Sequence, residues 1–230
     1  MTRADGVVLF VLLALVASFV FYTPLYPAYV AFNAEYGYVM AFFKFVVLAT
    51  FGEMLAARIR TGRYLPPEFG LLPRAVVWGI IGLTINFFFK VFALGVPPVV
   101  EQLGLTGATE AFRNGEITPT LVATAFCISV VMNLIYAPVM MLMHKVTDLH
   151  ILEYHGSLRA FLHPIKMKEI VAQRIDWTYM WAFVYKRTIP LFWIPAHTIS
   201  FILPANYRTL FAAILGIALG LILSIAAKKK

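Results

Sequence analysis

The chain has 230 residues, of which 61% are hydrophobic and only 13% are charged, and its mean hydropathy is +0.83. A soluble domain carries about 25% charged residues because its surface faces water, so this composition excludes a water-soluble protein and predicts an all-α polytopic membrane protein. The formal charge is +8, from 19 basic and 11 acidic residues. We attribute this basic excess to membrane topology and expect no nucleic-acid partner. The single Cys127 excludes an intrachain disulfide and a cysteine metal cluster.

Each predicted span is an apolar segment of about 20 residues, the helix length that crosses about 30 Å of hydrocarbon. The first follows Arg3 and lacks a small-residue cleavage site, so we interpret it as a retained anchor and not as a signal sequence. The fourth begins at Thr118-Pro119, a capping residue followed by the proline typical of a first helical turn. We predict one membrane domain over residues 1–230, with spans at about 7–24, 37–57, 75–95, 119–143, 189–204 and 208–227.

The basic residues are distributed asymmetrically around these spans. Fifteen of the 19 lysines and arginines fall in the terminal and loop segments of one side, whereas only Arg113 and Arg208 fall on the other. Cytoplasmic segments of membrane proteins carry the excess of Lys and Arg. We therefore place both termini in the cytoplasm, with the protein in the inner (plasma) membrane of a bacterium or in an organelle membrane of a eukaryote.

The longest loop, residues 144–188, lies on the cytoplasmic side in this topology. Its later part has polar and apolar residues at helical spacing and ends in a run of Trp and Tyr, which predicts an interfacial helix at about 165–187. Its earlier part contains His144, His150, His155 and His163. No HxxxH or HExxH pattern places two of these imidazoles on one helix face. We interpret them as interfacial residues and expect no metal, no cofactor and no enzymatic activity.

Polar side chains inside the predicted spans mark either functional sites or packed polar contacts, because ionisable groups are costly there. One helical stripe of the third span contains Gly79, Gly82, Asn86 and Lys90. Small residues admit a neighbouring helix, so the stripe predicts close helix packing with its two polar members pointing into the bundle.

Glu53 and Asn133 are the other polar residues that we place in the interior. Glu53 shares a helix face with alanines and points either into the bundle or to a basic residue at the inner boundary. Asn133 lies near the middle of the fourth span, in a stripe of small and polar residues, where it lines a path or bridges two helices.

The fifth span, WIPAHTISFILPANYR, is interrupted by Pro195 and Pro204. Each proline removes a backbone donor and leaves carbonyl groups that need partners. Irregular backbone at membrane depth is tolerated only where protein or a water cavity covers it. We therefore interpret this stretch as a broken span that lines a polar interior through His197 and Ser200, with Arg208 either at the outer mouth or tying the last two spans together.

The same stretch resembles the signature of the 22-kDa peroxisomal membrane protein family and its mitochondrial inner-membrane relatives. The matching residues are Trp193, Phe201, Pro204 and Arg208. His197 stands at the Gln position of that signature and Ser200 at the Asn position, and the first proline is displaced by one residue. Upstream, FGEML resembles the Gly-Asp element of the family, with Glu53 in place of Asp. Members of the family are usually drawn with four spans, whereas this sequence predicts six.

The interior polar residues and the resemblance together predict a channel or transporter for small solutes, with a narrow or gated path. The alternatives are a non-conducting structural protein, whose polar stripes only bind helices together, and a membrane enzyme that uses the histidine loop. Besides the lipid bilayer and small solutes, the expected partners include a second copy of the chain. The small-residue face of the last span, with Gly216 and Gly220, is the expected site of such a homo-oligomer.

Overall fold

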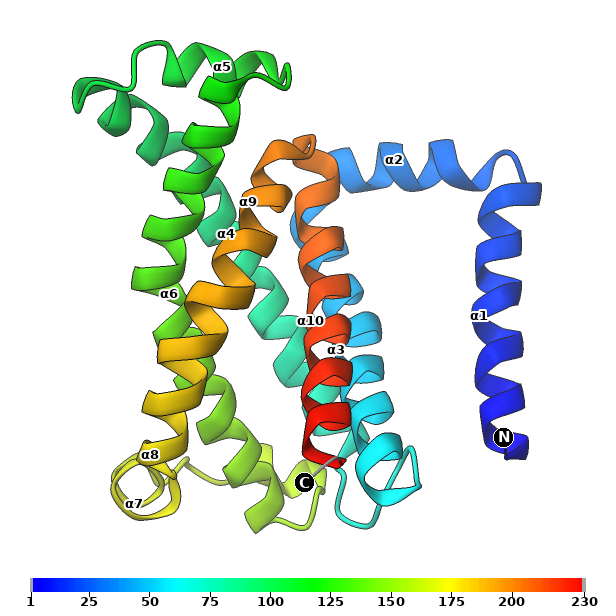
Figure 1. Ribbon diagram of the computed structural model, residues 1–230. Helices are drawn as coiled ribbons and strands as arrows, with labels where there is room; N and C mark the ends of the chain where they lie inside the picture. Colours follow the sequence, from blue (N-terminus) through cyan, green and yellow to red (C-terminus); the bar gives the residue numbers. More distant parts are fainter. Residues whose placement is uncertain (1, 229–230) are drawn as a thin grey trace. The chain divides into compact units, whose positions relative to one another are not determined.

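A computed structural model describes residues 2–228, and it describes their side chains except those of Val16 and residues 223–228. The end of the predicted sixth span therefore lies outside the described side chains. The described chain is helical and contains no strand, which confirms the all-α prediction (Figure 1). Five of its helices are long and apolar enough to cross a membrane: α1 (Arg3–Phe21), α3 (Gly37–Thr61), α4 (Leu71–Gln102), α6 (Pro119–Glu153) and α10 (Ala205–Lys228).

The chain divides into two compact units, residues 1–40 and 41–230. The first unit contains α1 and the shorter α2 (Leu25–Glu35). α1 begins with a capping box, in which the side chains of Thr2 and Asp5 each accept a hydrogen bond from the backbone N–H of the other. The predicted first anchor is therefore a helix with a defined start, two residues into the chain.

The second unit contains the bundle in which α6 packs against both α4 and α9 (Ile194–Ile202). α6 begins as predicted, because the Thr118 side chain accepts a hydrogen bond from the Leu121 N–H and Pro119 follows at the first helical position. The short helix α5 (Ala108–Asn114) lies in the connection between α4 and α6. We call this end of the bundle the outer end, and the opposite end the inner end, after the predicted topology.

Two glycines of the predicted stripe let α4 approach α3 closely. A Cβ atom on Gly79 would lie 2.4 Å from the Phe42 ring, and one on Gly82 would lie 2.7 Å from the Ala41 carbonyl oxygen. Only a residue without a side chain fits at such distances. The packing predicted from Gly79 and Gly82 is therefore present, and it holds the α3 and α4 backbones together.

The helix predicted over 165–187 is instead two helical segments, and the second of these runs on into the predicted fifth span. The first segment, α7 (Met167–Glu169) with η2 (Ile170–Arg174), ends where Ile175 becomes extended. Asp176 then caps a new helix by accepting a hydrogen bond from the Tyr179 N–H. This helix runs on through α8 (Trp177–Tyr179), η3 (Met180–Trp193) and α9 (Ile194–Ile202).

The prolines shape the second of these segments. η3 is a π-helical stretch that contains Pro190, which has no N–H for the usual α-helical hydrogen bond. α9 ends at Ile202, and Leu203 is extended before Pro204, as expected for a residue that precedes proline. The predicted break is therefore present at Pro204, which is also the predicted end of the span, whereas the helix continues through Pro195.

The opposite, inner end of the bundle brings two loops into backbone contact. Gly70 caps α4, and Gly156 follows the end of α6, in a loop that leads to the short helix η1 (Leu158–Leu162). A Cβ atom on Gly156 would lie 2.6 Å from both the Gly70 nitrogen and the Glu68 carbonyl oxygen. Both glycines have positive φ, so this contact requires glycine on steric and conformational grounds. It sets the start of α4 beside the end of α6.

Candidate functional site

A cavity of about 560 Å³ lies inside the second unit, surrounded by α3, α4, α6, α9, α10 and the η2–η3 segment. Most of its lining is apolar. Its polar lining in the middle of the bundle includes Asn133 and His197, and toward the inner end it includes Glu53 and His144. Asp176, which is exposed, also lines it, so the cavity extends to the inner surface.

Asn133 and His197 form a hydrogen-bonded pair between α6 and α9. The His197 Nδ1 atom lies 3.2 Å from the Asn133 Oδ1 atom, and Asn133 is fully buried. The Asn133 side-chain nitrogen donates to the Ser129 carbonyl oxygen at 2.8 Å, and the Ser129 hydroxyl donates to the Ile194 carbonyl oxygen at 2.7 Å. The pair therefore belongs to a hydrogen-bonded connection from α6 to the start of α9.

Aromatic rings enclose the His197 imidazole. Trp193 stacks on it with ring centroids 5.0 Å apart, and Phe89 meets it edge-on at 5.4 Å. The Trp193 indole nitrogen is buried and has no hydrogen-bond partner among the described residues. The expected interior residue His197 and the signature residue Trp193 thus form one aromatic wall of the cavity.

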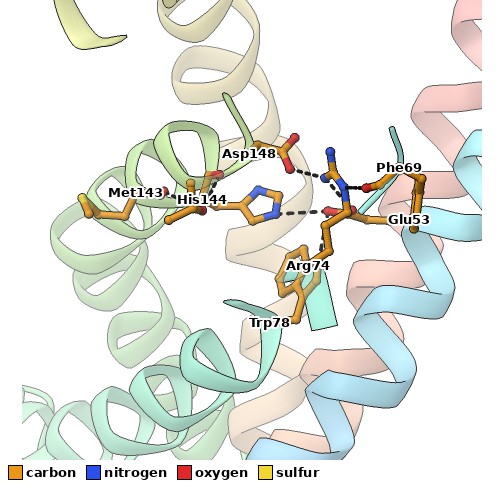
Figure 2. Close-up of polar contacts among 8 residues, drawn as sticks. Glu53, Phe69, Arg74, Trp78, Met143, His144 and Asp148 are labelled. Atoms are coloured by element: carbon orange, nitrogen blue, oxygen red, sulfur yellow. Dashed lines mark hydrogen bonds and ion pairs between the residues drawn. The ribbon is translucent and has the colours of Figure 1, made fainter. Parts of the chain in front are cut away.

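An ion cluster occupies the inner end of the bundle, where Arg74 of α4 lies between two carboxylates (Figure 2). Its Nη1 atom donates to Glu53 at 2.8 Å and also to Asp148, and its Nε atom donates to the Phe69 carbonyl oxygen. His144 and Asp148 lie one turn apart on α6 and so point from the same helix face. Glu53, Arg74, His144 and Asp148, which we call the ion cluster, join α3, α4 and α6.

Glu53 makes three contacts in the ion cluster, as many as Arg74. In addition to Arg74, it accepts from the Trp78 indole N–H at 3.0 Å, and its Oε1 atom lies 3.1 Å from the His144 Nε2 atom. The Glu53 side chain is 20% exposed, and that of Arg74 is 10% exposed. The carboxylate therefore faces the cavity with its charge already compensated by its neighbours.

The ligand types and spacing of this cluster also fit a metal ion. One atom each of Glu53, His144 and Asp148 lies within 4.8 Å of the others, the only such group among the described residues. However, the Arg74 guanidinium donates to both carboxylates and so already supplies the positive charge. A metal ion would have to displace it. The arrangement is that of a buried ion-pair network.

The four loop histidines do not come together. His144 belongs to the ion cluster, His150 contacts the Ala160 carbonyl oxygen at 2.8 Å, and His163 stacks on Tyr154. His155 is exposed and lies 2.6 Å from a Glu68 carboxylate oxygen. Each imidazole therefore has a separate contact, and the described structure offers no common site for the enzyme alternative.

Asn86 and Lys90, predicted to point into the bundle, have different surroundings. Asn86 is 8% exposed and accepts a hydrogen bond from the Thr209 hydroxyl at 3.0 Å, so it joins α4 to α10. Lys90 is exposed and does not line the cavity, which corrects its expected inward position. Four residues correspond to 400° of helix rotation, so Lys90 lies about 40° around α4 from Asn86.

Ser200 and Arg208 have structural contacts instead of cavity contacts. The Ser200 hydroxyl is fully buried and donates to the Ala196 carbonyl oxygen, one turn back in α9. Arg208 donates to the carbonyl oxygens of Leu203 and Phe201, at 2.9 and 3.3 Å, where α9 ends and the last carbonyl groups of a helix lack helical donors. Of the two expected roles, Arg208 therefore has the second, which is to tie the last two helices together.

The small-residue face of α10 packs within the chain. A Cβ atom on Gly220 would lie 3.6 Å from the Gly52 carbonyl oxygen of α3, while one on Gly216 would have no atom within 4 Å. Gly216 and Gly220 both line the cavity. The homo-oligomer expected through this face is not tested by these contacts and stays a prediction.

Arg74, Trp78 and Asp148 are site residues that sequence reasoning missed. Arg74 counts in the sequence as one more basic residue of the cytoplasmic side, although the structure leaves it only 8% exposed. One feature of the sequence could have indicated this site: His144 and Asp148 are four residues apart, which places two ionisable groups on one face of a helix. Their partner Arg74 is 74 residues from Asp148 and carries no such signal.

Comparison of the chain with models of protein families, with curated proteins and with solved structures finds no match. The resemblance to the 22-kDa peroxisomal membrane protein family stays a prediction. What the geometry establishes is an all-α bundle with membrane-length helices, an interior cavity and a buried ion cluster at its inner end.

Proposed function

We propose that this membrane protein passes small solutes through the interior cavity by a gated, channel-like or transporter-like route. The observation that carries the proposal is the cavity itself, which runs from the Asn133–His197 pair to the inner surface between membrane-length helices. Its volume of about 560 Å³ is that of a ligand-sized pocket. The proposal gives the chain a cytoplasmic N- and C-terminus and no catalytic activity or cofactor.

The route is closed toward the outer end. Leu121, Ile128 and Phe201 are exposed by no more than 1% and belong to the part of the bundle beyond the cavity. Large apolar side chains therefore fill the path between the Asn133–His197 pair and α5. A closed outer end supports gating, because a permanently open pore would dissipate the ion gradients of an energised membrane.

A cavity-filling substitution tests the proposal. Purified protein in liposomes should show solute flux by stopped-flow light scattering, and Gly216→Phe should abolish most of it. A Cβ atom at Gly216 would have no atom within 4 Å and Gly216 lines the cavity, so a ring attached there has room to extend into the cavity. Gly95→Phe is the matched control, because Gly95 is exposed on α4 and also has no atom within 4 Å of its Cβ position.

A non-conducting structural role is the second candidate. Two hydrogen bonds between helices, made by Asn86 and Asn133, favour it. In each, the polar side chain bonds to another residue of the protein and is not needed to contact a solute. Parent liposomes without flux of any small solute, together with a folded and stable protein, would decide for this alternative. Equal flux through Gly216→Phe and parent protein would exclude the cavity as the route.

A further inference from the structure

The hydrogen bonds of Asn133 fix which of its side-chain atoms faces His197. The amide nitrogen lies 2.8 Å from the Ser129 carbonyl oxygen, which accepts and never donates. The opposite orientation of the amide would set two acceptor oxygens against each other. The atom that faces His197 Nδ1 is therefore the amide oxygen, an acceptor.

This orientation fixes the tautomer of the uncharged imidazole. Because the Asn133 oxygen accepts, His197 Nδ1 must carry the proton of that hydrogen bond. The other ring nitrogen, Nε2, then has a free lone pair and acts as an acceptor. Nε2 makes no hydrogen bond with any residue of the described chain. It is also not one of the fully buried polar atoms that lack a partner, and His197 lines the cavity. Because His197 lines the cavity, this nitrogen is an acceptor there without a donor from the protein.

Apart from the Trp193 indole N–H, which is a donor without a partner among the described residues, the other polar side chains in the mid-bundle part of the wall make hydrogen bonds within the protein. The Tyr136 hydroxyl pairs with Thr84 at 2.7 Å, and the Thr188 hydroxyl donates to the Phe183 carbonyl oxygen at 3.2 Å. Both polar ends of Asn133 are occupied. A solute that reaches this depth therefore finds His197 Nε2 as the open acceptor, beside the stacked ring of Trp193.

The surroundings of His197 select against charge. No carboxylate of residues 2–228 lies within ion-pair distance of its ring, and Glu53 at the inner end is already compensated by Arg74, Trp78 and His144. A cation would therefore lose its hydration without gaining a free counter-charge. An anion would meet the Nε2 lone pair, which repels it.

We infer that the solute of this cavity is small and uncharged, and that it carries a hydroxyl or amide N–H group that donates to His197 Nε2. Asn133 is a positioning residue, which holds the imidazole in the accepting tautomer. This inference rests on the proposed function for its solute route, but the binding step that it names can be measured without any transport.

The binding test uses ¹⁵N-histidine-labelled protein in nanodiscs, with the His197 resonances assigned by their loss in His197→Gln. In the parent protein, Nε2 should give the signal of an unprotonated ring nitrogen. N-methylacetamide, which has one N–H donor, should shift that signal and bind about two- to tenfold more tightly than N,N-dimethylacetamide, which has none. Acetate and methylammonium should leave it unchanged. A protonated Nε2, or equal binding of the two amides, would overturn the inference.

The transport test compares glycerol flux in two substitutions of similar size. His197→Phe removes the acceptor and should lower glycerol flux by about two- to tenfold, whereas His197→Gln keeps an acceptor oxygen and should retain most of it. Unchanged flux in His197→Phe, with no difference between the amides in the binding test, would overturn the inference and leave the proposed function standing. Selective amide binding without glycerol flux would instead keep the binding site and remove the transport role.

Discussion

The ion cluster and the Asn133–His197 pair are both polar sites buried within one helical bundle, but they use their polar atoms differently. In the ion cluster, Arg74 and Glu53 each make three contacts, and opposite charges compensate one another. In the pair, two uncharged groups share one hydrogen bond of 3.2 Å, and one ring nitrogen stays open to the cavity.

Under the proposed function, this difference separates a site that holds helices together from a site that contacts the solute. Buried charges are costly to leave uncompensated, so a saturated cluster changes little when the cavity fills or empties. A neutral pair with an unused acceptor costs less to bury and can exchange partners. The comparison suggests that the ion cluster fixes the inner end of α3, α4 and α6, while His197 provides the contact for the solute.

The largest expected effect concerns which side of the membrane each end of the bundle faces. Labelling of a cysteine from one side either occurs or does not. In a Cys127→Ser background, a cysteine at Leu162 should react with an impermeant reagent from the cytoplasmic side, and one at Ile117 only from the opposite side. Both positions are strongly exposed, at 81% and 79%, and lie at opposite ends of α6. Reaction of both from one side would remove the topology that places the ion cluster at the cytoplasmic end.

Removal of the shared cation should give the largest loss of stability. Arg74→Ala leaves Glu53 and Asp148 without it, and we expect the free energy of unfolding in mixed micelles to fall by about 3 kcal/mol. This is the low end of the usual cost, because the two carboxylate side chains are 20% and 25% exposed. Arg63→Ala is the control, because Arg63 is exposed in the loop that precedes α4. A loss below about 0.5 kcal/mol would show that the cluster does not hold the bundle.

Neutralising one carboxylate should cost less. Glu53→Gln keeps an oxygen that can accept from the Trp78 indole N–H, and Arg74 keeps Asp148 and the Phe69 carbonyl oxygen. We expect a decrease of about 1–2 kcal/mol, the contribution of a hydrogen bond to a charged group. The same unfolding measurement checks it, and a loss equal to that of Arg74→Ala would mean that the cluster depends on the charge of Glu53 more than on its hydrogen bonds.

The sequence was sufficient for the five membrane-length helices, though not for the predicted fifth span at 189–204, because length and apolarity are local properties of a segment. α1, α3, α4 and α6 are apolar segments with local start signals, such as Thr118-Pro119. The break at Pro204 is local as well. The second half of the loop at 144–188 was mistaken for one helix, since the periodic pattern outweighed Asp176, whose side chain caps a new helix there.

The candidate site was only partly predictable because its contacts join distant parts of the chain. His197 and Asn133 attract attention as polar residues in apolar segments, and the structure brings them together across 64 positions. Lys90 gives the same signal and is exposed. Arg74 gives the opposite signal, as one basic residue among many near a span boundary, yet it is the centre of the ion cluster. Side-chain direction and partner identity come from packing, which composition does not encode.

The smallest expected effect is the stability contribution of the Asn133–His197 hydrogen bond. Hydrogen bonds between membrane helices contribute about 0.6 kcal/mol on average, because the unfolded chain in a membrane also finds partners. We therefore expect the coupling free energy between Asn133→Ala and His197→Phe, from a double-mutant cycle, to be about 0.6 kcal/mol. Arg74→Ala with Glu53→Gln should give a larger coupling in the same assay, since charges interact there.

The control for this cycle is Asn86→Ala with Thr209→Val, which removes another interhelical hydrogen bond of 3.0 Å that does not involve the cavity. The two neutral pairs should have similar coupling free energies, but only the Asn133 and His197 substitutions should alter binding of N-methylacetamide. A coupling above about 2 kcal/mol for Asn133–His197 would place the pair with the ion cluster as a structural contact. A low coupling free energy for this pair, combined with a strong effect of its substitutions on N-methylacetamide binding, is the outcome that supports His197 as the solute contact. An acceptor that contributes little to holding the helices together is available to the solute.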